Sequence, residues 1–209
     1  MFIAANGEFN EWLASIAENL IPVLDILRLG SRHASVYQFL VHHPSHLELL
    51  LGLTRTSVPN CMLVYRIFAH LVAHHSNDAT ILQYRQALLD TSVAALVDSD
   101  VSFTKHGQWK NVQIAVATLL LNLAVQQASS SPELEVKSSL VVAIGQVVTK
   151  VQEEEALFRV LAAAGTALND DDEALAVAQS LDLHASMEHL TKVPGKVGQC
   201  AQHVLARLA

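Results

Sequence analysis

Cationic side chains recur on three predicted helices that are well separated in the chain. Arg66 and Arg159 share their helix faces with small residues, and Lys110 directly precedes Asn111. Small neighbours leave room for the planar guanidinium group of an arginine to reach a carboxylate. A single arginine on a helix is usually solvated or joined to a nearby acid. Three such helices in succession indicate a shared basic groove that accepts an acidic guest.

A polar stripe runs along the most apolar predicted helix, residues 109–127. At 100° per residue, Thr118 and Asn122 each fall within about 20° of the direction of Asn111. Polar groups on such a helix need hydrogen-bond partners. An amide offers both a donor and an acceptor, so Asn111 and Asn122 are predicted to pair with the backbone of a bound peptide. In the alternative interpretation, Asn122 satisfies a loop carbonyl inside the core.

No catalytic motif accompanies these residues. The sequence has no GxSxG, no glycine-rich phosphate loop, no HExxH and no recognisable Cys–His pair, so an enzyme is not expected. His70 and His74 stand four residues apart but lack a third ligand nearby, so neither a metal nor another cofactor is predicted. Cys61 and Cys200 lie far apart without framework spacing, which favours a reducing compartment.

Composition excludes several further classes. The 209 residues include 13 Lys and Arg against 20 Asp and Glu, a formal charge of −7 without any basic run, so a nucleic-acid partner is not expected. Hydrophobic residues make up 51% of the chain, which excludes a disordered protein. The most apolar stretch, 112–125, is interrupted by polar residues and is too short to span a membrane. The first residues lack the pattern of a signal peptide.

Helical segments with short connections account for nearly the whole sequence. Asn60 is expected to cap one helix, and a long helix from 78 to 98 is expected to break near Asp90 and Thr91. Ser131 and Pro132 form a strong start signal for another. Helix groups recur at roughly 40 residues, which is compatible with armadillo or HEAT repeats. We therefore predict one all-α domain over residues 1–209, built as a right-handed α-solenoid. The expected helices cover residues 8–20, 22–29, 34–41, 46–54, 60–73, 78–98, 109–127, 132–151, 153–168, 173–181, 185–190 and 194–208.

Five segments, in order along nearly the whole chain, carry a family resemblance. They are IPVLDILRL at 21–29, KNVQIAVATLLLN at 110–122, EALFRVLAAAGTAL at 155–168, DDDEA at 170–174 and KVGQC at 196–200. Together these segments resemble the PUL domain family. Two departures are His33-Ala34-Ser35, where the family more often has His-Pro-Ser, and a short loop over 52–60.

The resemblance implies about six armadillo-like repeats without catalytic activity, and a basic concave groove. In the family this groove binds the C-terminal tail of the hexameric AAA unfoldase valosin-containing protein. Arg66 and Arg159 match the groove arginines, while Lys110 and Asn111 match a Lys–Asn pair. The resemblance also implies a role in ubiquitin-dependent degradation, with ubiquitin reached only through other domains, in the cytoplasm and also in the nucleus.

A second hypothesis is a structural or oligomerisation module that positions an attached ubiquitin-binding or desumoylating domain. In that case the polar stripes are core groups bonded within the chain, and the arginines pair with local acids such as Glu153 or Glu155. The two hypotheses differ in whether Arg66, Lys110 and Arg159 meet on one surface without being neutralised by their own chain.

Overall fold

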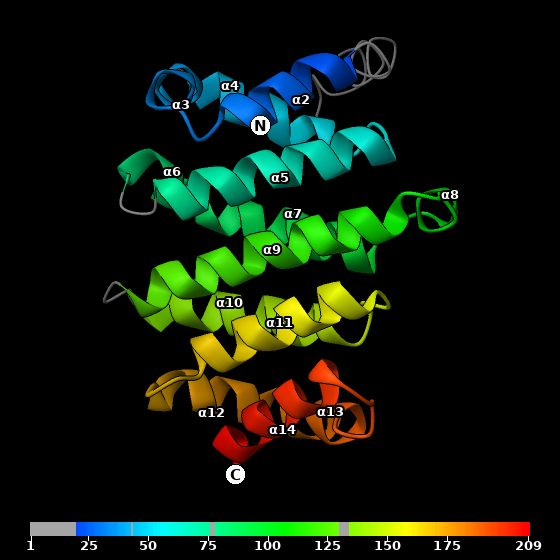
Figure 1. Ribbon diagram of the computed structural model, residues 1–209. Helices are drawn as coiled ribbons and strands as arrows, with labels where there is room; N and C mark the ends of the chain where they lie inside the picture. The colour runs from blue at the N-terminus through cyan, green and yellow to red at the C-terminus, as the bar shows by residue number, and fades with distance from the viewer. Residues whose placement is uncertain (1–19, 43, 76–77, 130–133) are drawn as a thin grey trace.

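A computed structural model describes residues 20–42, 44–75, 78–129 and 134–209. Within these ranges the chain forms thirteen helices and no strand, which confirms the predicted all-α class (Figure 1). The helices are α2 (Ile21–Gly30), α3 (Ala34–Val41), α4 (Pro44–Leu53), α5 (Val58–His74), α6 (Ala79–Gln83), α7 (Arg85–Val97), α8 (Val101–Thr104), α9 (Trp109–Ala128), α10 (Leu134–Val148), α11 (Glu154–Ala167), α12 (Asp172–Ser180), α13 (Leu183–Leu190) and α14 (Lys196–Leu208).

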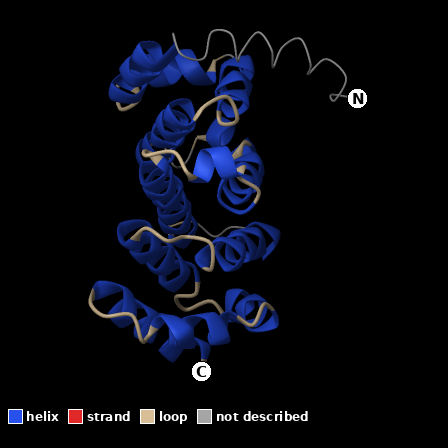
Figure 2. Ribbon diagram, turned by 90° about the vertical axis from the view of Figure 1, so that its right-hand side faces the viewer, coloured by secondary structure: helices blue, strands red, loops and turns tan. Residues whose placement is uncertain are grey.

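The helices stack in two layers, from α2 at one end of the molecule to α14 at the other (Figures 1 and 2). We call α2, α5, α9, α11 and α14 the front layer; its members run in the same direction across Figure 1, and α9 packs most extensively against α5 and α11. Helices α7, α10 and α12 pack one on another behind it. This order confirms the predicted α-solenoid, whereas the number of about six repeats stays a prediction.

The core lies between the two layers and is densest around α5 and α9. Tyr65, Ile67 and Phe68 of α5 are completely buried. The hydroxyl of Tyr65 donates a hydrogen bond of 2.7 Å to the carbonyl of Thr91 on α7, so the one polar atom of this ring has a partner in the layer behind. Burying each such large side chain contributes roughly 1.5–3 kcal/mol. The front layer is therefore anchored on its inner side, and part of its outer side stays accessible.

Polar contacts between neighbouring front-layer helices repeat at a nearly constant sequence separation. His70 contacts the carbonyl of Arg28 across 42 residues, and Arg159 bonds Thr118 across 41. Lys196 reaches Glu155, again across 41 residues. These separations agree with the repeat length of roughly 40 expected from the sequence.

One buried amide fixes how α11 sits against α9. Glu153, at the N-cap of α11, makes no capping bond with its own side chain. Instead, Oε1 of Gln113 on α9, which is 3% exposed, accepts the backbone N–H groups of Gln152 at 2.8 Å and Glu153 at 3.0 Å. Because free N–H groups at a helix start need acceptors, this side chain joins the two helices at one register.

The main differences from the expected helices are a cap, the position of a break and an additional short helix. Ser57, not Asn60, caps α5, and Ser57 Oγ accepts the Asn60 N–H at 3.3 Å. The long helix expected over 78–98 breaks at Tyr84 and not near Asp90 and Thr91, which lie inside α7, and the short α8 was not anticipated. The predicted helix over 8–20, apart from Leu20, and the start signal at Ser131 and Pro132 lie outside the described residues. Neighbouring helices supply packing and caps that local patterns do not contain, so these boundaries depend on tertiary structure.

Candidate functional site

Two front-layer helices each leave one narrow stripe accessible. On α5 the stripe is Pro59, Met62, Arg66, His70, Ala73 and His74. On α9, between residues 110 and 125, it is Lys110, Asn111, Ile114, Thr118, Leu121, Asn122 and Val125. We call the outer side of α2, α5, α9, α11 and α14 the front face. All five residues predicted to bind a partner lie on it, on the adjacent helices α5, α9 and α11.

Arg66 is half-buried, and its guanidinium makes no hydrogen bond or ion pair with any described residue. Desolvation lowers the pKa of Arg66, and the nearby Arg28 lowers it further, while Asp25 opposes the shift. Asp25 itself is paired with Arg28 Nε at 2.7 Å. Two guanidinium groups therefore share one carboxylate at this end of the front face, which leaves Arg66 available to an external acid.

Arg159 has partners within the chain. Its Nε donates to Glu155 Oε1 at 3.0 Å, a second nitrogen lies 3.0 Å from the same oxygen, and a third bonds the hydroxyl of Thr118 on α9. Lys196 of α14 bonds the other oxygen of Glu155, so one carboxylate lies between two cations. Lys196 first and Arg159 second lower the pKa of Glu155.

Lys110 and Asn111 lie in the first turn of α9, farther along the front face. Lys110 is exposed and Asn111 is half-buried, and neither side chain bonds another described residue. Eight residues separate Lys110 from Thr118, which is about 12 Å along the helix. The structure thus brings Arg66 and Arg159 to helices on either side of α9, with Lys110 and Asn111 about two turns away.

Asn122 uses part of its amide within the chain. Its Nδ2 donates to the carbonyl of Ala69 on α5 at 2.8 Å, so the residue ties two front-layer helices together. The acceptor is a helix carbonyl rather than the loop carbonyl of the alternative interpretation. One amide hydrogen is committed to this bond, which leaves the second hydrogen for other contacts.

Nearly the whole chain matches the model of one protein family. The PUL domain family model matches residues 11–203 of the chain. This chain belongs to the PUL domain family. A curated relative, the phospholipase A-2-activating protein of Xenopus laevis, is 29% identical over 199 residues; the match covers 91% of this chain and 24% of the relative. The chain therefore spans about a quarter of the relative's length, and the match supports a protein-interaction domain.

The front face of this PUL domain includes cations that sequence reasoning did not select. Lys196 lies beside Glu155, and Arg32 contacts Nε2 of His70 at 3.4 Å. The repeat length could have predicted one of them, because Lys196 follows Glu155 by 41 residues and therefore occupies the equivalent place on the next front-layer helix. Arg28 lies one such step before His70. Local helix periodicity does not reveal these partners, because they come from neighbouring helices.

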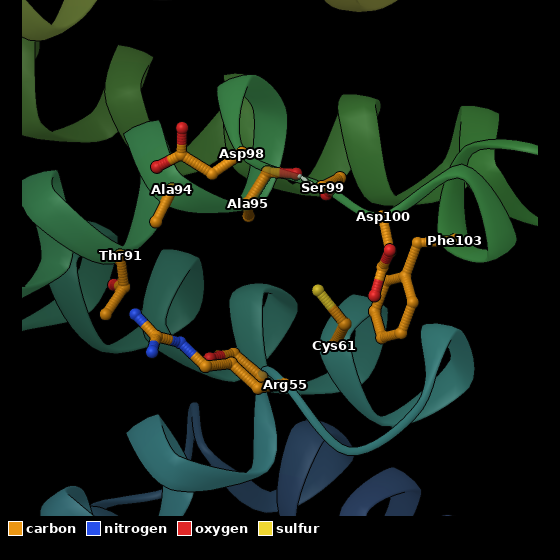
Figure 3. Close-up of a pocket in the computed structure, with 10 residues that line it drawn as sticks. Arg55, Cys61, Thr91, Ala94, Ala95, Asp98, Ser99, Asp100 and Phe103 are labelled. Carbon is orange, nitrogen blue, oxygen red and sulfur yellow. Dashed lines mark hydrogen bonds between the residues drawn. The ribbon is translucent and has the colours of Figure 1, made fainter.

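A cavity of about 360 Å³ lies between the start of α5 and the end of α7, and its lining includes no residue of the α5 and α9 stripes (Figure 3). Its lining includes Arg55, Cys61, Asp98, Asp100 and Phe103. Figure 3 shows the sulfur of Cys61 directed into the space. Burial raises the pKa of the Cys61 thiol to about 12. At neutral pH this sulfur is therefore a thiol and not a reactive thiolate, so the cavity does not have the character of a cysteine nucleophile site.

No helix in the described part of the chain is long and apolar enough to cross a membrane. Nor do the described residues contain a group of three or more His, Cys, Asp or Glu side chains arranged to hold a metal ion. His70 and His74 meet edge to face with ring centres 6.4 Å apart, and His75 stacks on Tyr37 at 3.5 Å. These imidazoles are thus used in ring packing.

Proposed function

We propose that this PUL domain is a non-catalytic adaptor whose front face binds the acidic C-terminal tail of the AAA unfoldase valosin-containing protein. In this role it links the unfoldase to ubiquitin-dependent degradation in the cytoplasm and nucleus, and ubiquitin is bound by other domains. The observation that carries the proposal is Arg66, a half-buried guanidinium without an acidic partner among the described residues, on the helix next to the Thr118–Arg159 contact.

The proposed mechanism is charge pairing along an extended peptide. Arg66 and Lys110 contact tail carboxylates directly, while Asn111 and the free part of the Asn122 amide hold the tail backbone. Each charge-assisted hydrogen bond contributes roughly 1.5–3 kcal/mol when it is partly desolvated. Binding weakens with added salt, because exposed charges are screened within about 8 Å at physiological ionic strength.

The test is a fluorescence anisotropy titration with a labelled peptide of the unfoldase tail. We expect the double variant Arg66→Ala/Arg159→Ala to bind at least tenfold more weakly than the wild type, since it loses a cation on each side of α9. The matched control is Arg207→Ala, which removes an exposed cation from the last turn of α14. Equal affinity of the double variant and the wild type would remove the assignment of the front face.

A structural or oligomerisation module remains the second candidate, because two observations favour it. Arg159 is paired with Glu155, and the Asn122 amide is bonded to Ala69, as that hypothesis requires. Light scattering distinguishes the two candidates. A monomer that binds the tail peptide supports the adaptor, whereas a stable oligomer without affinity for the peptide supports the structural module.

A further inference from the structure

Glu155 occupies a position in which its carboxylate is held from two sides. One oxygen faces two nitrogens of Arg159, each at 3.0 Å, and the other bonds Lys196 Nζ on the next front-layer helix. Lys196 also lies over the ring of Phe158, with its nitrogen 5.0 Å from the ring centre. We call Arg159, Lys196 and Phe158 the carboxylate seat. The carboxylate seat contributes two cations and Glu155 one anion, so together they carry a net positive charge.

The carboxylate seat lies at the surface and not in the core. The exposed fractions of the Arg159, Glu155 and Lys196 side chains are 31%, 36% and 43%. Ion pairs with this degree of exposure contribute little net stability, because water solvates the separated charges almost as well. Glu155 can therefore leave the carboxylate seat at small cost, while the chemistry of the seat continues to select a carboxylate.

We propose that Glu155 is an internal competitor, and that a carboxylate of the bound acidic peptide replaces it between Arg159 and Lys196. This inference rests on the proposed function, since the incoming group belongs to the same peptide. It adds Lys196 and Phe158 to the binding surface and gives Glu155 the opposite role to the cations around it. Binding then includes an exchange step in which Glu155 turns toward solvent and one acid takes the place of another.

The incoming carboxylate has two possible sources, the C-terminal carboxylate of the peptide and an acidic side chain. Both present two oxygens to the guanidinium and the ammonium group in the same way. An amidated peptide separates them. If the terminal carboxylate enters the carboxylate seat, amidation lowers the affinity for the wild type; if a side chain enters, amidation leaves it within about twofold.

Glu155→Gln tests the exchange directly, with the labelled tail peptide as the probe. The substitution removes the competing charge and keeps the side chain's size, so we expect binding roughly threefold to tenfold tighter than in the wild type. Glu154→Gln is the matched control. Glu154 is exposed, lies one residue earlier in α11 and forms no ion pair within the described chain, yet its substitution changes the net charge equally. We expect less than a twofold change from it.

The outcomes separate this inference from the proposed function. Affinity that is equal in Glu155→Gln and Glu154→Gln, or lower in Glu155→Gln, would mean that Glu155 is a strut that orients its neighbours, and the exchange would be rejected. If that happens while Arg66→Ala/Arg159→Ala still loses affinity, the proposed function stands. No peptide binding by the wild type overturns both. Lys196→Gln provides a second test. If the peptide carboxylate occupies the carboxylate seat, adding Lys196→Gln to Glu155→Gln must lower the affinity for the peptide.

Discussion

Arg66 and Arg159 lie on helices that flank α9, yet their own chain treats them differently. Arg66 meets a second guanidinium group, Arg28, whose acid is already engaged, and it has no acidic partner in the described chain. Arg159 is bonded to Glu155 and to Thr118. The same side chain in the same layer is thus open at one end of the front face and occupied at the other. A match in residue type alone therefore does not show how strongly a residue acts on a partner.

The largest effect is expected from a change beneath the carboxylate seat. A Cβ atom on Gly198 of α14 would lie 2.1 Å from the carbonyl oxygen of Val193, so Gly198→Ala must displace the loop before α14 or the helix itself. We expect a loss of about 1–3 kcal/mol in the free energy of unfolding. Thermal unfolding measures it. Tail binding should lose its dependence on Lys196 and keep its dependence on Arg66, because only the carboxylate seat is disturbed.

Gly165→Ala is the control for this prediction. A Cβ atom at Gly165, inside α11, meets only Val204 Cγ2 at 3.6 Å, an ordinary contact. Alanine is also the better helix former, so this variant should be neutral or up to about 1 kcal/mol more stable. If Gly198→Ala unfolds at the same temperature as Gly165→Ala, the close approach at Gly198 does not position α14.

The next largest effect separates the two arginines by their contribution to binding. We expect Arg66→Ala to weaken tail binding roughly tenfold or more, since Arg66 forms no ion pair within the described chain and the nearby Asp25 is already bonded to Arg28. Arg159→Ala should cost only about threefold, because the wild type must first break the pair with Glu155. Single-variant titrations measure both. A larger loss in Arg159→Ala than in Arg66→Ala would reverse the comparison.

The sequence predicted the fold well and the state of each site residue less well. Apolar periodicity is a property of each helix, so the succession of helical segments predicted the all-α solenoid, and the sequence of α9 alone predicted the stripe with Asn111, Thr118 and Asn122. The bonds of Asn122 to Ala69 and of Arg159 to Thr118 cross to other helices, 53 and 41 residues away. Such partners depend on the register between helices, which side-chain contacts and caps such as that of Gln113 determine.

The smallest expected effect is a difference in pH dependence between the two ends of the front face. Near Arg66, the Nδ1 of His70 lies 3.1 Å from the Arg28 carbonyl, and its Nε2 lies 3.4 Å from Arg32. A guanidinium only donates, so Nε2 accepts and the ring is neutral. Burial first, and then the nearby Arg32, Arg28 and His74, lower the pKa of His70 below 6.5. The unfolded chain therefore takes up this proton more readily, and stability should fall as the pH drops below about 6.5.

Glu155 responds in a different window. Because Lys196 and Arg159 lower the pKa of Glu155 below 4.5, its contribution to stability is present above that value and is lost only as the pH falls through the lowered pKa.

Chemical denaturation between about pH 7.5 and pH 5 should show a loss in the free energy of unfolding on the order of 1 kcal/mol or less in the wild type and a smaller loss in His70→Asn. His203→Asn, an exposed position on α14, is the control and should follow the wild type. Glu155→Gln should also follow the wild type in this range and depart from it only in stronger acid, by less than about 1 kcal/mol after solvent screening. A Glu155→Gln effect already at pH 6 would show that the two ends are coupled and do not titrate separately.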